Sequence, residues 1–284
     1  MNIGAVISFE TNIGKLAKVA IEAAVKDVNP DPTTLVGTKL KVTMQDSNRS
    51  GILATAQASD PTLSSLQFPY FVRTGHSDLY QMAAIAEIVD YYGWREVIAI
   101  YGDDEHGRNG IAALGDKLTA KRCKITFKAC LSPTATKDEI TDLLVKVALS
   151  ESRILLVHTS ASWGMEVFLI AHDLGMVESG YVWIATDWLS TVLDTNSPLS
   201  EDEMEDIQGV VSLRMHTPDS VLRRRFVSRW KNLTSVDKSN GPIGLNTYGL
   251  YAYDTVWLLA HAIDSLFRQG GNISFSKDSR LAEI

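Results

Sequence analysis

The sequence has little cysteine, and this scarcity excludes two kinds of architecture. Only Cys123 and Cys130 occur among 284 residues. A disulfide framework or a thiolate zinc cluster needs more thiols, and the spacing of these two is not that of a redox CxxC motif. A strand across RCKITFKAC would hold them roughly 20 Å apart, at about 3.3 Å per residue, so we expect no bridge between them. We interpret both cysteines as structural.

The sequence also has no excess of positive charge and no long apolar run. Its net charge is -7 and its pI is near 5.4, so no overall positive field attracts phosphates and we expect no nucleic-acid partner. No apolar run reaches the about 18 residues that a membrane-spanning helix needs. Met1-Asn2-Ile3 leads directly into an apolar strand, so no signal peptide is expected. These absences predict a soluble, untargeted chain.

The common catalytic signatures are missing as well. There is no GxSxG elbow, no phosphate-binding GxxxxGKS or GxxxxGKT loop, no HExxH helix and no GxGxxG after the first strand, so we expect no catalytic residue and no cofactor. The loop GDDEHG at 102–107 places carboxylates beside a histidine. It lacks EF-hand spacing and a second histidine at metal-ligand distance, so we interpret it as a hydrated loop and expect no metal. An α/β enzyme of unrecognised chemistry stays an alternative.

What the sequence does contain is an alternation of short apolar runs and helical stripes. Strands are expected at 3–9, 39–44, 96–101, 124–128, 153–158, 181–185 and 209–214. Helices are expected near 13–28, 79–89, 111–118, 140–147, 167–174, 217–230 and 251–266, with an acidic loop at 201–206. Gly175 should close one helix and Gly270-Gly271 the last one. Strands that alternate with helices predict an α/β fold with parallel sheets.

Polar side chains follow three of the expected strands, where parallel sheets place functional residues. They are residues 103–106, 158–160 and 187–188. Acids, hydroxyls and aromatics in such loops suit a small zwitterion, with a carboxylate for its amine and hydroxyls for its carboxyl group. The other interpretation is that these residues cap the helices that follow. Capping is the simpler role for Asp103 and Ser160, and both interpretations stay open for Asp187.

A basic run, RRRFVSRWK at 223–231, could indicate a site for an anion or a calmodulin-like partner. Its aromatic residues have core spacing, which leaves the arginines for solvent. We therefore interpret it as the solvated face of a helix.

Six longer stretches are similar to those of one known family. They are DPTLSSLQFPYFVRT, YYGWREVIAIY, GRNGIAALGDKL, GYVWIATDWLS, RRRFVSRWKN and LYAYDTVWLLAHAID. Together they resemble the extracellular amino-terminal domain of plant glutamate receptor-like channels, over essentially the whole chain. The resemblance implies a two-lobed type I periplasmic-binding-protein fold. Lobe 1 would comprise 1–73 and 215–284, and lobe 2 would comprise 74–214.

One junction departs from the family. A helix that begins at Gly51 runs after a few residues into the turn Ser59-Asp60-Pro61, and the strand that the alternation requires does not follow. The family has the rest of that helix, a strand, a hydroxyl-rich loop, another helix and another strand here. The resemblance therefore implies that a block is missing near residue 58, so that lobe 1 is incomplete.

The resemblance also implies a site and a function. It assigns ligand binding to Ser59, Tyr101, Asp103, Glu105 and Asp187, with Asp187 where related receptors hold the ligand amine. The chain would be the ligand-binding region of an amino-acid-gated ion channel without its pore. It would bind a small amino acid, assemble with like or unlike receptor subunits, and lie at the extracellular face of the plasma membrane. The alternative is an assembly module or a truncated product without function.

Overall fold

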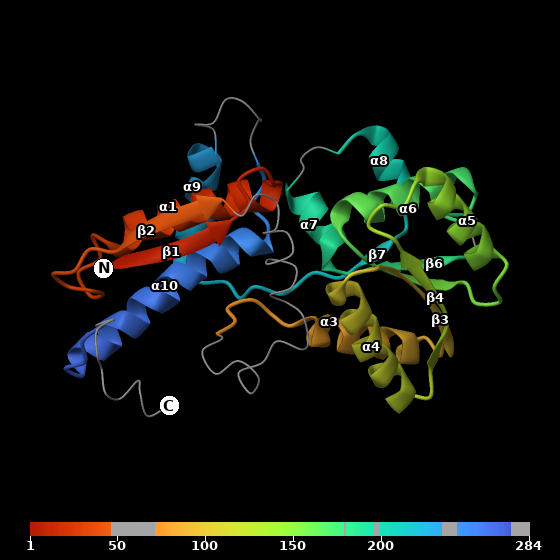
Figure 1. Ribbon diagram of the computed structural model, residues 1–284, viewed down its shortest axis with the longest axis horizontal. Helices are drawn as coiled ribbons and strands as arrows, with labels where there is room; N and C mark the ends of the chain where they lie inside the picture. The colour runs from red at the N-terminus through yellow and green to blue at the C-terminus, as the bar shows by residue number, and fades with distance from the viewer. Residues whose placement is uncertain (47–71, 179, 196–198, 235–242, 274–284) are drawn as a thin grey trace. The chain divides into compact units, whose positions relative to one another are not determined.

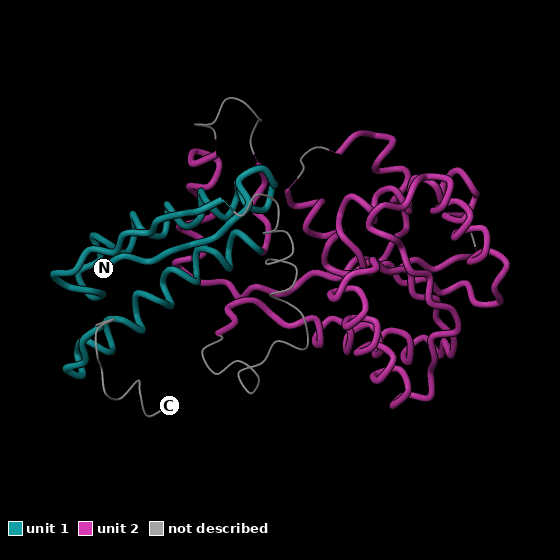
Figure 2. The backbone as a smooth tube through the Cα atoms, in the orientation of Figure 1, with its two compact units in different colours: residues 1–51, 248–284 teal, residues 52–247 magenta. Residues whose placement is uncertain are grey.

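The computed structural model describes residues 1–46, 72–178, 180–195, 199–234 and 243–273 (Figure 1). It divides into two compact units (Figure 2). Unit 1 comprises residues 1–51 and 248–284, and unit 2 comprises residues 52–247. Each unit is built from both strands and helices, as the alternation predicted. The lobe boundaries drawn from the resemblance stay a prediction.

Unit 2 contains a five-stranded parallel sheet in the order β4-β3-β5-β6-β7. The strands are β3 (Glu96–Gly102), β4 (Lys124–Leu131), β5 (Ile154–His158), β6 (Val182–Ala185) and β7 (Val211–Ser212). The strand order reverses between β3 and β5, because β4 follows β3 on one side and β5 adds on the other. Such a switch point is where open parallel sheets bind ligands, outside the carboxyl ends of the strands.

Helices cover both faces of this sheet (Figure 1). On one face, α3 (Asp78–Tyr91) and α4 (Glu105–Ala120) pack against alternate residues of the strands, among them Ala99, Leu156 and Ile184. On the other face, α5 (Lys137–Ala148) and α6 (Ala161–Asp173) pack against the remaining alternate residues. Burial on both faces explains why β3 and β5 are apolar runs without alternation in the sequence.

Local signals set several helix ends of unit 2. Thr136 accepts a hydrogen bond from the Glu139 backbone N–H while the Glu139 side chain accepts one from the Thr136 N–H, a capping box that starts α5. At the end of α6, Gly175 takes a φ of 68° and its N–H donates to the His172 carbonyl. This confirms Gly175 as the residue that closes the helix.

Unit 1 contains β1 (Asn2–Ile7) and β2 (Lys41–Asp46), which pair in parallel, with α1 (Asn12–Val28) and α10 (Thr247–Arg268). Polar contacts tie α10 to the rest of the unit. The Tyr253 hydroxyl donates to Asp27 at 2.6 Å, and the Leu35 N–H donates to Asp264 at 3.1 Å. Gly270 has a φ of 78° where α10 ends, as predicted.

The region between β6 and α10 differs from the prediction. The residues after Asp187 form α7 (Asp187–Thr195), and the expected acidic loop is α8 (Glu201–Asp206). A second capping box, between Ser200 and Glu203, starts α8. The expected strand at 209–214 is reduced to the two residues of β7.

The next helix also begins later than predicted, as α9 (Val221–Thr234). The hydroxyl of Ser220, and not that of Thr217, accepts a hydrogen bond from a first-turn N–H, that of Arg223. On α9, Phe226 is buried while Arg224 and Arg225 are exposed, which agrees with a solvated basic face.

Candidate functional site

A buried polar cluster lies at the carboxyl end of the unit 2 sheet, on the face that α3 and α4 cover. We call it the histidine cluster and define it as Asp78, Gln81, His106, His158 and Asp187. Asp78 and Gln81 come from the first turn of α3, and His106 comes from the first turn of α4. His158 is the last residue of β5, and Asp187 is the first residue of α7, directly after β6. The cluster therefore stands at the switch point of the sheet.

Its side chains form a continuous series of contacts. The Asp187 backbone N–H donates to Gln81 Oε1 at 3.1 Å, and Gln81 Nε2 donates to Asp78 Oδ1 at 2.6 Å. Asp78 Oδ2 lies 3.1 Å from His106 Nδ1, and the rings of His106 and His158 have centroids 4.4 Å apart with their planes tilted by 43°. His158 Nδ1 then contacts the Thr186 hydroxyl at 3.1 Å.

Burial and neighbouring charges set the protonation of the cluster. Burial, and after it the charge of His106, lowers the pKa of His158 to about 3, so this imidazole is neutral. Burial is the largest influence on the pKa of His106 and would lower it, but the combined interactions with Asp78, Asp104 and Asp187 raise that pKa above its ordinary value. Burial and then the Asp78 carboxylate raise the pKa of Asp187 to about 6. The cluster thus combines a neutral imidazole at His158, a contact with Asp78 that favours the protonated form of His106, and a carboxylate at Asp187 whose ionisation is disfavoured by burial.

Gly110 of α4 makes room for His158. A Cβ at this position would lie 2.3 Å from His158 Nε2, a distance that no side chain tolerates. The imidazole therefore reaches the cluster only because α4 has no side chain at this point.

The structure separates the ligand residues that the resemblance assigned. Asp187 belongs to the histidine cluster. Tyr101 is half-buried at the end of β3, where burial, and after it Cys130, raises the pKa of its phenol. Asp103 is exposed and forms an ion pair with Arg108. Whether either residue contacts a ligand stays a prediction.

The other assigned residues lie elsewhere. Glu105 is exposed at the start of α4, and Ser59 lies outside the described residues. Asp104, and not Asp103, caps α4. Its side chain accepts a hydrogen bond from the Gly107 N–H at 2.7 Å. Ser160 occupies the position before α6, but its side chain makes no capping hydrogen bond.

Asp78 and Gln81 were not predicted as site residues. The helix was predicted to begin near residue 79, yet Leu79 is 39% exposed while Asp78 and Gln81 are each 2% exposed. The buried stripe in fact runs through positions 78, 81, 82, 85, 86 and 89. Two polar residues at core positions of a helix were the signal that could have indicated a buried polar site.

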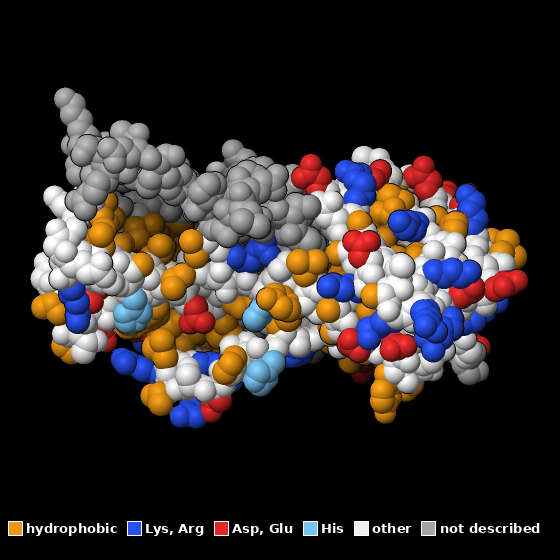
Figure 3. Space-filling model, turned by 90° about the horizontal axis from the view of Figure 1, so that it is seen from below, with side chains coloured by type: hydrophobic (Ala, Val, Ile, Leu, Met, Phe, Trp, Pro, Cys, Tyr) orange, Lys and Arg blue, Asp and Glu red, His pale blue; other side chains and the backbone are white. Residues whose placement is uncertain are grey.

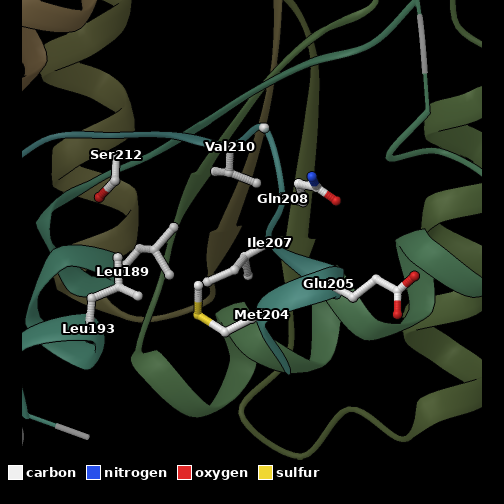
Figure 4. Close-up of a pocket in the computed structure, with 9 residues that line it drawn as sticks. Leu189, Leu193, Met204, Glu205, Ile207, Gln208, Val210 and Ser212 are labelled. Atoms are coloured by element: carbon white, nitrogen blue, oxygen red, sulfur yellow. The ribbon is translucent and has the colours of Figure 1, made fainter. Parts of the chain in front are cut away.

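A separate cavity of about 480 Å³ lies beside α7 and α8 (Figure 4). It is lined by Leu189, Leu193, Met204, Glu205, Ile207, Gln208, Gly209, Val210 and Ser212. The apolar side chains converge on it, whereas the Glu205 carboxylate points away from them (Figure 4). None of the four described ligand residues, Tyr101, Asp103, Glu105 and Asp187, is among those that line this cavity, and its described lining has no paired charges for a zwitterion.

The surface shown in Figure 3 carries basic and acidic side chains of unit 2 interspersed with one another. Among the described residues of unit 2 on this face, no extended patch of one sign of charge is visible (Figure 3). Among the described residues, no helix is long and apolar enough to cross a membrane.

Comparison with known proteins identifies the class. Residues 52–282 match the model of the family described as "Receptor family ligand binding region". The chain therefore belongs to this family of receptor ligand-binding regions, which is not a family of enzymes, and its parallel α/β units agree with the periplasmic-binding-protein-like fold of that family.

Individual relatives narrow the class to plant glutamate receptors. Glutamate receptor 3.4 of Arabidopsis thaliana is 45% identical over 99% of the chain, and Glutamate receptor 3.2 of the same species is 43% identical over 100%. Glutamate receptor 3.1 of Oryza sativa subsp. japonica is 42% identical over 100%. The chain is thus homologous to plant glutamate receptors and spans about a third of their length, 33–35% of these three.

The alignments are longer than the chain. They extend over 320 to 326 positions although the chain has 284 residues, so these relatives have at least 36 residues (320 against 284) in the matched region that the chain lacks. A missing block is consistent with this difference. Its predicted position, near residue 58, lies outside the described residues.

Proposed function

We propose that the chain is the extracellular ligand-binding region of a plant glutamate receptor-type channel and binds a small amino acid. Family membership supports the receptor role. The observation that carries the ligand proposal is the position of Asp187. Its carboxylate stands at the carboxyl end of β6, next to the switch point of the only five-stranded sheet among the described residues.

A ligand ammonium group suits Asp187 for an electrostatic reason. Burial and the neighbouring Asp78 disfavour the ionised form of Asp187 and raise its pKa to about 6. A positive charge placed beside it would compensate both effects and stabilise the carboxylate. The hydrogen bond between Gln81 and the Asp187 backbone fixes the start of α7, so the carboxylate is held in place before a ligand arrives.

Thermal unfolding with a panel of free amino acids tests the proposal. The protein is first treated with EDTA so that no metal ion contributes. A ligand that binds only the folded state should stabilise it by about 2.7 kcal/mol at 100 times its dissociation constant. Asp187→Asn should abolish the shift for that amino acid.

Asp116→Asn provides the matched control, because Asp116 is an exposed aspartate of α4 outside the cluster. It should retain the full shift. Equal shifts in wild type and Asp187→Asn would contradict the assignment of Asp187. The absence of a shift with every amino acid would contradict ligand binding by this chain.

A second candidate function is assembly with other receptor subunits. Val145 of α5 and Leu149, which caps its end, lie one turn apart and are 43% and 82% exposed. Exposed apolar side chains at this spacing favour a contact with another chain. Size-exclusion chromatography at several concentrations tests this function, and Leu149→Glu should shift any oligomer towards the monomer.

A further inference from the structure

We propose that Asp78, His106 and His158 together bind one divalent transition-metal ion, and that zinc is the ion their ligand set fits best. This site lies within the histidine cluster but does not require an amino-acid ligand. It therefore goes beyond the proposed function.

The three side chains converge from separate elements. One oxygen of Asp78, one nitrogen of His106 and one nitrogen of His158 all lie within 4.8 Å of one another. They come from the starts of α3 and α4 and from the end of β5. No second histidine lies near residues 102–107 in the sequence, but the fold brings His158 to His106 from 52 residues further along the chain.

The surroundings of the two histidine nitrogens suit a metal ion. Among the described residues, His158 Nε2 and His106 Nδ1 are buried and lack a hydrogen bond of good geometry. His106 Nδ1 instead faces Asp78 Oδ2 at ion-pair distance, 3.1 Å, so a metal ion would displace the proton between them and be held by both atoms. A metal ion at His158 Nε2 would satisfy a buried nitrogen that is otherwise costly.

The neighbour of His158 Nδ1 is compatible with metal binding at the other ring nitrogen. The Thr186 hydroxyl donates to the Val157 carbonyl at 3.5 Å, so in the tautomer with the proton on Nδ1 it would accept from His158, 3.1 Å away. A neutral imidazole with its proton on Nδ1 has its lone pair on Nε2. Metal-ligating histidines are held in this way by a partner on the other ring nitrogen.

Two imidazoles and one carboxylate form a ligand set typical of zinc with a fourth position left for water or another ligand. Magnesium and calcium prefer oxygen ligands and suit this set poorly. Bonds of about 2.0–2.1 Å require tetrahedral ligand atoms about 3.4 Å apart, so no separation has to shorten by more than about 1.4 Å from the 4.8 Å within which all three atoms lie. The His106 side chain is 17% exposed and lies in the first turn of α4, where it can make this adjustment.

The experiment is a titration of the purified chain with zinc after EDTA treatment and without amino acids. Calorimetry should give one zinc per chain. Cobalt(II) in place of zinc should give visible absorption bands of a four-coordinate site. Cys130→Ser serves as the background throughout, because Cys130 is an exposed free thiol that could bind metal itself.

Variants distinguish this site from unspecific binding. His106→Gln and Asp78→Asn remove one ligand each and should weaken zinc binding by more than about 100-fold. Thr186→Val removes only the partner of His158 and should weaken it by about 10–100-fold. His172→Gln is the matched control, since His172 also pairs with an aspartate, Asp206 at 2.8 Å, but lies outside the cluster. It should bind zinc like the parent.

Two results would overturn the proposal. One is no zinc binding by the parent up to about 100 μM, a concentration at which a site of even 10 μM affinity would be nearly saturated. The other is equal zinc affinity in the parent and in a folded His106→Gln variant. His106 is the first variant to test because its side chain is the least buried of the three, and circular dichroism would verify that the variant folds.

Discussion

At the scale of single residues, Asp187 should make the stability of the metal-free protein depend on pH. Its pKa is raised from an ordinary value of 3.8 to about 6, first by burial and then by Asp78. The folded state therefore favours the protonated form. This contribution to stability is complete below about pH 4 and is lost as the pH rises through 6. Asp187→Asn, which is neutral at every pH, should unfold at a higher temperature than wild type at pH 7 and at a similar temperature at pH 4.

The measurement is thermal unfolding in EDTA at half-unit intervals from pH 4 to 7. Other carboxylates titrate in the same window, so the difference between the two proteins is the quantity to follow. A difference that stays constant over this range would show that Asp187 ionises normally in the folded state.

Gly110 gives a second prediction at this scale. Gly110→Ala places a methyl group 2.3 Å from His158 Nε2 and should destabilise the protein by about 1–3 kcal/mol, because the buried ring has to move. Gly115→Ala in the same helix is the matched control, since its new methyl group would have Ile125 Cδ1 at 3.9 Å as its nearest neighbour. It should stabilise the protein by about 0.5–1 kcal/mol through helix propensity. Urea unfolding measures both, and equal effects would rule out the steric explanation.

At the scale of elements, the capping box of α5 gives a prediction that is independent of the site. Thr136→Ala removes the side-chain acceptor for the Glu139 N–H and should cost about 1 kcal/mol. Thr141→Ala, in the middle of the same helix, should be neutral or stabilise by up to about 0.7 kcal/mol. Urea unfolding of the two variants makes the comparison. A similar loss in both would mean that the hydroxyl at the cap contributes nothing specific.

The same helix signals show how far the sequence predicts the fold. Most helices and strands of unit 2 were predicted, because in each of them the spacing of the apolar residues and the residues at its ends indicate the same kind of element. The region after β6 was predicted less well, because its acidic residues were interpreted as a loop where α8 in fact lies. Yet the capping box of Ser200 and Glu203, which starts α8, has the spacing that also starts α5. A local signal was present there and the high charge of the segment outweighed it in the prediction.

The site was predicted less completely than the elements. His106, His158 and Asp187 were identified as polar residues at strand ends, since the fold class alone places them there. Asp78 and Gln81 belong to the first turn of a helix, where polar residues usually cap, so their place on the buried stripe was overlooked. The contact of His106 with His158 depends on strand order and on the packing of α4 against the sheet, and neither follows from spacing along the chain.

At the scale of the whole molecule, the two units should differ in stability. In unit 2, four consecutive residues of β3 are fully buried, and helices pack on both faces of a five-stranded sheet. Among the described residues of unit 1, the sheet has only β1 and β2, and Val6 of β1 is 68% exposed. Local opening follows the apolar area that holds an element in place. Backbone amides of β1 and β2 should therefore exchange with solvent faster than those of β3 and β5.

Hydrogen exchange followed by mass spectrometry of peptides checks this directly. We expect peptides that cover β3 and β5 to retain their protection longest, and peptides that cover β1 and β2 to lose it at least about tenfold sooner, which corresponds to an opening free energy smaller by about 1.4 kcal/mol. Equal protection in both units would show that the chain opens as one cooperative body. In that case the residues that relatives have and this chain lacks would not be needed to complete the sheet of unit 1.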